Sequence, residues 1–296
     1  MSKGKVIGYL FYTIIITGLF LYIQFPEELI LKGIERYVNS APLGVRVKVD
    51  KARLGFPDTL CLEDTEIFYK EMGSLIKGDI YLRPKLREIL KGRYGARYRI
   101  RFSKGEVEGE ISTERSNKSE VDLLLNISDF DLSQLKEMIG KLGRELSGSM
   151  DGKIHLLFPF KNPIDGRGSG NLVVRDMAFK VFSPFPLSFL GMDRVELDFV
   201  EGRFELRNRA IRFRILRLSS SKFKGEFRGD IRLKKMLFRS RLKLTGRLSL
   251  NTSFIKELSK STLIQKGFRR YLNSKGGIPV VIYGTIESPR FRIERI

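Results

Sequence analysis

The chain has few residues whose types and spacing suit catalysis or metal binding. His155 is its only histidine and Cys61 its only cysteine, so a zinc site of the usual ligand spacing and an intrachain disulfide are both excluded. Neither a GxSxG turn nor a Walker A loop is present, and "GRGSG" at 166–170 lacks the spacing of a dinucleotide fingerprint. We predict a hairpin turn at 166–170, and a strand position with a satisfied ring for His155.

Two charged runs resemble binding sites more closely. "EVEGE" places Glu106, Glu108 and Glu110 on one side of a strand, as a cation site or an acid-base pair requires. Three solvated carboxylates on an exposed face are the simpler interpretation. "RNRAIRFRILRL" at 207–218 interleaves arginines with Phe213, but alternation sends Phe213 to the opposite face from Arg212 and Arg214, so stacking and phosphate contacts would not converge. We expect no nucleic-acid partner, no enzymatic activity, and no catalytic residue, cofactor or metal.

An uncharged apolar run follows Lys3 and Lys5 and extends from Val6 to Phe25, before Glu27. Twenty such residues are about enough to cross a bilayer core as a helix, and a cleaved signal peptide, the alternative, would have a shorter run and a small-residue cleavage site. We predict a cytoplasmic stub and transmembrane anchor at 1–26 with a cytoplasmic amino terminus. The apolar anchor residues are Val6, Ile7, Leu10, Ile14, Ile15, Ile16, Leu19, Phe20, Leu21 and Phe25.

The formal net charge of +21 is the most unusual property of the composition. A surface this basic attracts anionic partners, and an external location favours phospholipid headgroups or acidic proteins over nucleic acid. A solvated basic face with no specific partner is the alternative. The candidate basic surface consists of Arg212, Arg214, Lys222, Lys224, Arg228 and Arg232.

The rest of the chain predicts a short juxtamembrane helix at 27–40 and then a β-rich domain at 41–296. "KFKGEFRGDIRLK" at 222–234 and "RLKLTGRLSL" at 241–250 alternate apolar and charged residues with period two, which is typical of antiparallel strands with one buried face. Glycines within them predict bending. The apolar face either forms a closed core or stays partly open as a groove, lined by Phe223, Phe227, Ile231, Leu233, Leu242, Leu244, Leu248 and Leu250. A helix from about Ser253 to Gly276 could plug one end.

The order of these features resembles that of the type II secretion system protein N family (GspN), which is related to the AsmA-like envelope proteins. The resemblance covers nearly the whole chain and includes "VRVKVDKARLGFPDTLCLEDTEIF", "DLSQLKEMI" before "LSGSMDGKIHLLFP", and the ending "IPVVIYGTIESPRFRI". It implies a mainly β fold with a few short helices, in which a transmembrane helix precedes a curved antiparallel AsmA-like sheet, and in which the ending forms the terminal strand pair.

The resemblance also implies a location and two roles. The protein would sit in the bacterial inner membrane as a single-pass protein with its main domain in the periplasm. Its first expected role is a non-enzymatic component of the type II protein secretion system, with other secretion components as partners. The second is a phospholipid transfer or bridge protein with an apolar β groove, and a plain structural tether is a third.

Overall fold

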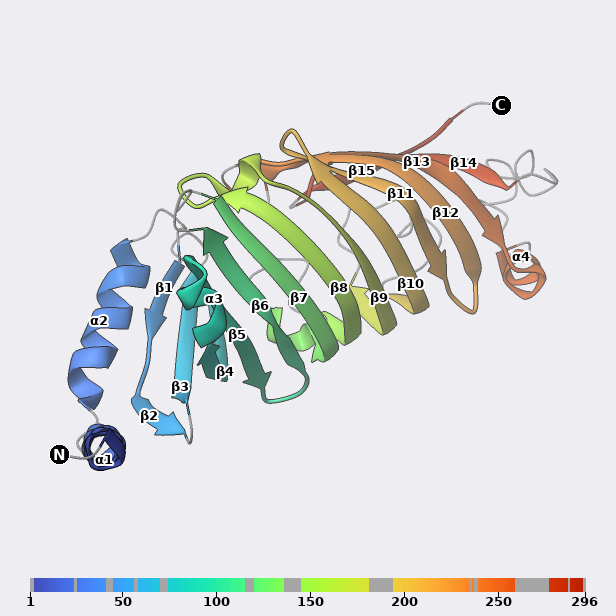
Figure 1. Cartoon of the computed structure of the whole chain (residues 1–296). Helices are drawn as coiled ribbons and strands as arrows, with labels where there is room; N and C mark the ends of the chain where they lie inside the picture. Colours follow the sequence, from blue (N-terminus) through green and yellow to red (C-terminus); the bar gives the residue numbers. More distant parts are fainter. Residues whose placement is uncertain are drawn as a thin grey trace.

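The protein is mainly β, and its computed structural model shows one large curved sheet flanked by short helices (Figure 1). The structure describes residues 3–23, 26–40, 45–55, 58–69, 74–114, 120–135, 145–180, 194–234, 236, 239–258, 277–286 and 288–294. The sheet has 15 strands, almost all of them paired with the next strand in the chain, and every pairing is antiparallel. The predicted mainly β fold with a curved antiparallel sheet is therefore confirmed.

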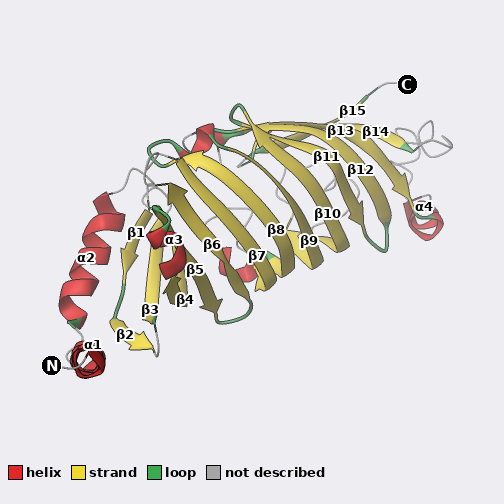
Figure 2. Ribbon diagram, in the orientation of Figure 1, coloured by secondary structure: helices red, strands yellow, loops and turns green. Residues whose placement is uncertain are grey.

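Helices are few (Figure 2). The helical elements are α1 (Lys3–Ile23), α2 (Glu27–Ser40), α3 (Leu86–Leu90), η1 (Leu132–Leu135), η3 (Pro163–Asp165) and α4 (Thr252–Leu258). Helices α1 and α2 lie at the amino-terminal end of the sheet, α4 lies at its carboxyl-terminal end, and the short α3, η1 and η3 lie against strands between them. The strands are β1 (Val45–Lys48), β2 (Lys51–Gly55), β3 (Thr59–Tyr69), β4 (Ser74–Pro84), β5 (Arg93–Phe102), β6 (Glu106–Glu114), β7 (Glu120–Asp131), β8 (Ser147–Pro159), β9 (Arg167–Lys180), β10 (Arg194–Arg207), β11 (Ala210–Ser219), β12 (Phe223–Arg232), β13 (Arg241–Leu250), β14 (Ile278–Thr285) and β15 (Pro289–Ile293).

Irregular positions interrupt the strands at intervals. The pairing register shifts in β3 near Asp64 and in β7 near Asp129, and both aspartates have positive φ angles of 48° and 47°. Each bulged N–H donates to an aspartate on a nearby strand, Asp64 to Asp79 Oδ1 at 3.1 Å and Asp129 to Asp151 Oδ1 at 3.0 Å. Bulges bend a strand and increase its twist, so they contribute to the curvature that we had predicted from glycines alone.

Helix α2 covers one edge of the sheet. The side chains of Glu35 and Asn39 accept hydrogen bonds from the backbone N–H groups of Val49 and Val47, at 3.1 and 2.9 Å. Glu27 does the same for the N–H of Ala52 at 2.9 Å. Unpaired N–H groups at a sheet edge invite other strands to pair, so these three side chains protect the β1 and β2 edge. The helix predicted at 27–40 is confirmed.

Helix α1 precedes α2 and contains most of the apolar run. Over the described parts of the chain, no helix combines the length and the apolar composition needed to cross a membrane. This finding does not support the span predicted at 6–25. Phe25 lies outside the described residues, and the side chains of Ile14, Ile15, Leu19 and Leu21 are not described.

Two further sequence predictions can be compared with the structure. The hairpin turn predicted at 166–170 is wrong, because residues 167–170 begin strand β9 and only Gly166 lies in the turn after η3. The small residues there fit a strand because Phe204 and Leu156 lie across them: a Cβ on Gly170 would be 2.7 Å from the Phe204 ring, and one on Gly168 2.8 Å from Leu156. The helix predicted from about Ser253 is present as α4, but residues 259–276 lie outside the described part.

Candidate functional site

One face of the sheet carries an unbroken row of apolar residues and glycines. Residues paired directly across neighbouring strands project to the same face, and the register can be followed from Ala52 on β2 to Ile293 on β15. The row consists of Ala52, Leu62, Ile80, Ile100, Val107, Ile127, Gly152, Leu172, Gly202, Leu216, Phe227, Gly246, Val280 and Ile293. We call this side the apolar face and the other side the charged face. At about 4.8 Å per strand, the row extends for about 60 Å along the sheet.

The apolar face is closed at its carboxyl-terminal end. Phe227 is 1 % exposed and its ring lies across Gly225 and Gly246, where an added Cβ would be 2.8 and 2.6 Å from ring carbons. Leu244, Ile278 and Val280 are buried around it. Phe254 of α4 is 4 % exposed and packs with Phe223 in a neighbouring cluster. This end therefore forms an ordinary core, and α4 covers part of it.

The same face is more accessible on β6, β7 and β8. Ile111, Leu123 and Leu156 lie directly opposite one another in a row parallel to the first. Ile111 is 39 % exposed, and Leu123 and Leu156 are only partly buried. The accessible part of the apolar face thus lies several strands away from the strands on which the groove was predicted.

The eight predicted groove residues all belong to, or border, strands β12 and β13. Phe223, Phe227 and Leu244 are buried, and Ile231, Leu233, Leu242, Leu248 and Leu250 are partly buried. Their alternation identified the apolar face correctly. It could not reveal which part of that face is covered, because cover comes from residues distant in the sequence.

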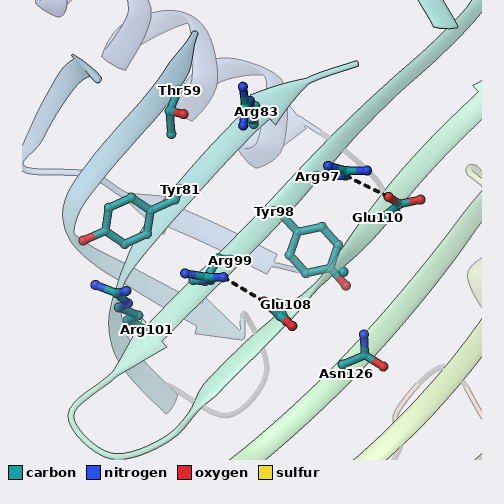
Figure 3. Close-up of a pocket in the computed structure, with 11 residues that line it drawn as sticks. Thr59, Tyr81, Arg83, Arg97, Tyr98, Arg99, Arg101, Glu108, Glu110 and Asn126 are labelled. Atoms are coloured by element: carbon teal, nitrogen blue, oxygen red, sulfur yellow. Dashed lines mark hydrogen bonds and ion pairs between the residues drawn. The ribbon is translucent and has the colours of Figure 1, made fainter. Parts of the chain in front are cut away.

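The charged face of β5 and β6 carries matched charges. Arg97 Nε donates to Glu110 Oε1 at 3.0 Å, and Arg99 donates to Glu108 Oε2 at 3.0 Å (Figure 3). Glu106 lies 3.9 Å from both Arg99 and Arg101. A hollow of about 560 Å³ lies over these strands. All three carboxylates of "EVEGE" are engaged in ion pairs, so the arrangement favours a structural ladder over a cation or acid-base site.

Tyr98 and Glu110 have shifted pKa values beside this ladder. The Tyr98 hydroxyl donates to the backbone oxygen of Leu124 at 2.7 Å, and burial raises the pKa of Tyr98 to about 12. A hydrogen bond from Lys85 and another from Arg97 lower the pKa of Glu110 below its usual value. Both shifts stabilise the ordinary protonation states of these groups near neutral pH, a neutral phenol and a charged carboxylate, and neither prepares a group for proton transfer.

His155 lies on β8 and faces the charged side. Its Nε2 is 2.8 Å from Asp122 Oδ1 on the neighbouring strand, and both side chains are about half exposed. The ring therefore has a partner, as we predicted. No group of three or more His, Cys, Asp or Glu side chains in the described residues could hold a metal ion.

The predicted basic surface is partly neutralised. Arg214 pairs with Glu205, Arg228 with Glu226 at 3.3 Å, and Arg232 with Asp230 at 3.6 Å. Lys222 lies over the Phe254 ring at 5.5 Å. Arg212 and Lys224 are exposed and have no ion pair among the described residues. The predicted surface therefore has less free charge than its sequence indicates.

A second basic region went unrecognised in the sequence. Strands β13, β14 and β15 contain no acidic residue, yet their charged face displays Arg241, Lys243, Arg247, Arg290 and Arg292. The signal was present in the alternating ending "PRFRI", but only the register joins it to β13. Comparisons of the chain with protein-family models, with curated proteins and with solved structures found no match.

Proposed function

We propose that the protein is a non-enzymatic carrier that binds the acyl chains of phospholipid along its apolar face. One observation carries this proposal: the apolar row crosses the sheet from β2 to β15 without a polar side chain. If the apolar face served only as a closed core, apolar residues would be needed only on the strands that other parts of the protein cover. Ala52 and Leu62 near one end of this row and Phe227 near the other are buried in closed cores, so the part of the row between them offers a path for an apolar ligand.

Accessibility supports the same proposal on β6 to β8. Ile111 remains 39 % exposed, although its alternation places it on the apolar face. Apolar surface left in contact with water is costly at about 25 cal/mol per Å², and contiguous exposed apolar surface commonly marks a binding site. We propose that acyl chains enter the apolar face here, and that the closed end at Phe227 limits how far they extend.

Two adjacent leucines on β7 provide a matched test. Leu123 faces the apolar side, opposite Ile111, while Leu124 faces the charged side, opposite Glu110, and is 41 % exposed. We expect the full chain to co-purify with phospholipid that native mass spectrometry detects. Leu123→Asp should lose this lipid because it places a charge in the apolar row, and Leu124→Asp should retain it.

Circular dichroism of both variants controls for folding. Lipid-free wild-type protein, or equal lipid content in the two aspartate variants, would refute the carrier proposal. If Leu123→Asp does not fold, Leu123→Ser replaces it in the test, because burying a hydroxyl costs less free energy than burying a charge.

We propose in addition that α1 anchors this carrier in the bacterial inner membrane, with the sheet in the periplasm. The support is its exposed apolar surface, since Val6, Ile7, Leu10 and Phe20 are 47, 65, 62 and 59 % exposed. Lys3 and Lys5 precede the helix core and Glu27 and Glu28 follow it, which favours a cytoplasmic amino terminus. Resistance of the full chain to alkaline extraction from membranes tests the anchor, and release into the soluble fraction would count against it.

A role in type II secretion is the second candidate, and the resemblance to protein N motivates it. The specific observation in its favour is that the basic charged face of β13 to β15 offers a docking surface for acidic partner proteins. Deletion of the gene should then reduce export of folded secreted proteins. If the Leu123→Asp variant restores export in the deletion strain, this role is separate from lipid binding. Unchanged export after deletion would refute the role.

A further inference from the structure

The charged face of β13, β14 and β15 has an excess of positive charge that the described residues do not neutralise. Arg241, Lys243, Arg247 and Arg290 are exposed and have no ion pair among the described residues. Arg292 has one partner, Glu294, at 3.8 Å. On most other parts of this face, basic side chains meet carboxylates on their own or a neighbouring strand. The excess is therefore local and is not a general property of the sheet.

The register places three of these basic side chains and three neighbouring polar side chains at one corner of the face. Arg241 lies directly between Arg232 on β12 and Thr285 on β14. Lys243, two residues further along β13, lies opposite Tyr283, and Tyr283 lies opposite Arg290 on β15. Directly opposite residues have Cβ atoms about 5 Å apart. We call this group, formed by Arg232, Arg241, Lys243, Tyr283, Thr285 and Arg290, the basic corner.

Without a bound anion, repulsion between like charges in the basic corner destabilises the folded sheet. Arg232 and Arg241 are directly opposite like charges, which destabilise a strand pair. Among the described residues, the carboxylate beside this group is Asp230, which pairs with Arg232 at 3.6 Å and is opposite Lys243 without approaching it within ion-pair distance. The four cations and this carboxylate leave a net positive charge among the described residues, and an external anion would reduce the repulsion.

We propose that the basic corner binds a phosphate group. Arginine guanidinium groups donate paired hydrogen bonds to phosphate oxygens, and lysine adds a mobile point charge. Tyr283 is 38 % exposed and contributes a hydroxyl donor at the centre. Thr285 Oγ1 accepts a hydrogen bond from the Ser288 N–H at 3.1 Å, which leaves its hydroxyl proton to donate. The phosphate belongs either to a phospholipid headgroup or to a soluble phosphate compound.

This site is independent of the acyl-chain proposal because it lies on the opposite face. The test uses the full chain in a neutral detergent, and thermal unfolding with inorganic phosphate or with chloride at equal ionic strength. We expect phosphate to raise the Tm of the wild type by several degrees through binding to the folded state. In the double variant Arg241→Gln/Lys243→Gln, phosphate should raise the Tm by less than about one degree.

The matched control neutralises two arginines in the ladder, Arg97→Gln/Arg99→Gln, which should keep the full response to phosphate. Without phosphate at low ionic strength, the basic-corner variant should melt at or above the wild-type Tm, since it removes repulsion, whereas the ladder variant should melt below it. The proposal would be overturned if phosphate raised the Tm of the basic-corner variant as much as that of the wild type. It would also be overturned if neither phosphate nor short-chain phosphatidic acid changed the Tm of the wild type.

A short-chain phosphatidic acid below its micellar concentration distinguishes the two sources. Binding at least tenfold tighter than inorganic phosphate, and dependent on Arg241 and Lys243, would assign a lipid headgroup. Equal affinities would assign a soluble phosphate. Leu123→Asp should leave the effect of inorganic phosphate unchanged, so failure of the acyl-chain proposal and failure of this one give different results.

Discussion

The middle of the sheet and its carboxyl-terminal end differ on both faces, and in opposite senses. On β5 to β8 the charged face satisfies itself through pairs such as Arg97 with Glu110, while the apolar face stays accessible at Ile111. On β12 to β15 the apolar face is closed around Phe227, while the charged face keeps cations, such as Lys243, that have no ion pair among the described residues. The repeated hairpin pattern thus leaves an accessible apolar surface in the middle of the sheet and unmatched cations at its carboxyl-terminal end.

This difference shows that strand alternation does not determine function by itself. The pair β12 with β13 and the pair β6 with β7 both place mainly apolar residues on one side and mainly polar residues on the other. What varies is whether each side is covered or neutralised by other parts of the protein. An accessible apolar row and an unmatched basic group are two places where the described part of the fold leaves an interaction unmade, and the two proposals rest on them.

The largest expected effect contrasts the carboxyl-terminal end of the apolar face with its middle. Phe227→Ala removes a ring that is 1 % exposed and should cost about 3–5 kcal/mol in the free energy of unfolding. Ile111→Ala should cost about 1 kcal/mol or less, because Ile111 is 39 % exposed and its side chain already meets water. Denaturant unfolding of the full chain measures both. Equal losses in the free energy of unfolding would mean that the apolar face is packed alike around Phe227 and around Ile111.

A smaller effect is expected at Tyr98, which lies on the apolar face directly opposite Gly109. Tyr98→Phe removes the hydroxyl that donates to the Leu124 oxygen at 2.7 Å and should cost about 1 kcal/mol. Because burial raises the pKa of Tyr98 to about 12, the folded state favours the neutral phenol. Its contribution is complete below pH about 10 and is lost as the pH rises toward 12.

Unfolding measured between pH 9 and 12 should therefore show a steeper alkaline loss for the wild type than for Tyr98→Phe. Parallel loss of stability in the two proteins would show that the phenol is not buried as described.

The smallest effect compares matched and unmatched charge directly. Lys85 and Arg97 lower the pKa of Glu110. The carboxylate therefore stabilises the folded state above the unfolded pKa of about 4.3, and this stabilisation is lost as the pH falls through the folded pKa. Glu110→Gln should lower the Tm at pH 7 and converge with the wild type in acid. Arg247→Gln, in the unmatched region, should leave the Tm unchanged or slightly raised at pH 7. A clear drop in Tm for Arg247→Gln would contradict the contrast.

Local pattern sufficed to predict much of the fold. Alternation at 222–234 and 241–250 predicted β12 and β13, and the resemblance carried by the ending implied the terminal pair β14 and β15, all of which the structure shows. The helix at 27–40 matches α2. These features depend on residues close in sequence, where periodicity and turn residues carry the information.

Features that depend on register could not be predicted. The ion pair between Arg214 and Glu205 joins two strands, as does the meeting of Arg232 with Arg241, and alternation alone gives no pairing partner. The same limit explains why Phe223 and Phe227 were assigned to a groove: their burial comes from Phe254 and from residues on other strands. The bulges at Asp64 and Asp129 also need a positive φ that the residue type permits but does not demand.

The central claim, that lipid occupies the apolar face at β6 to β8, is tested most directly by photo-crosslinking in cells. A photoreactive residue would replace Ile111 or Leu124, which are 39 and 41 % exposed on opposite faces of the sheet, and Phe227 would serve as a buried control. We predict phospholipid adducts at Ile111 and none at Leu124 or Phe227. Equal adducts at Ile111 and Leu124, or protein adducts alone at Ile111, would contradict the account.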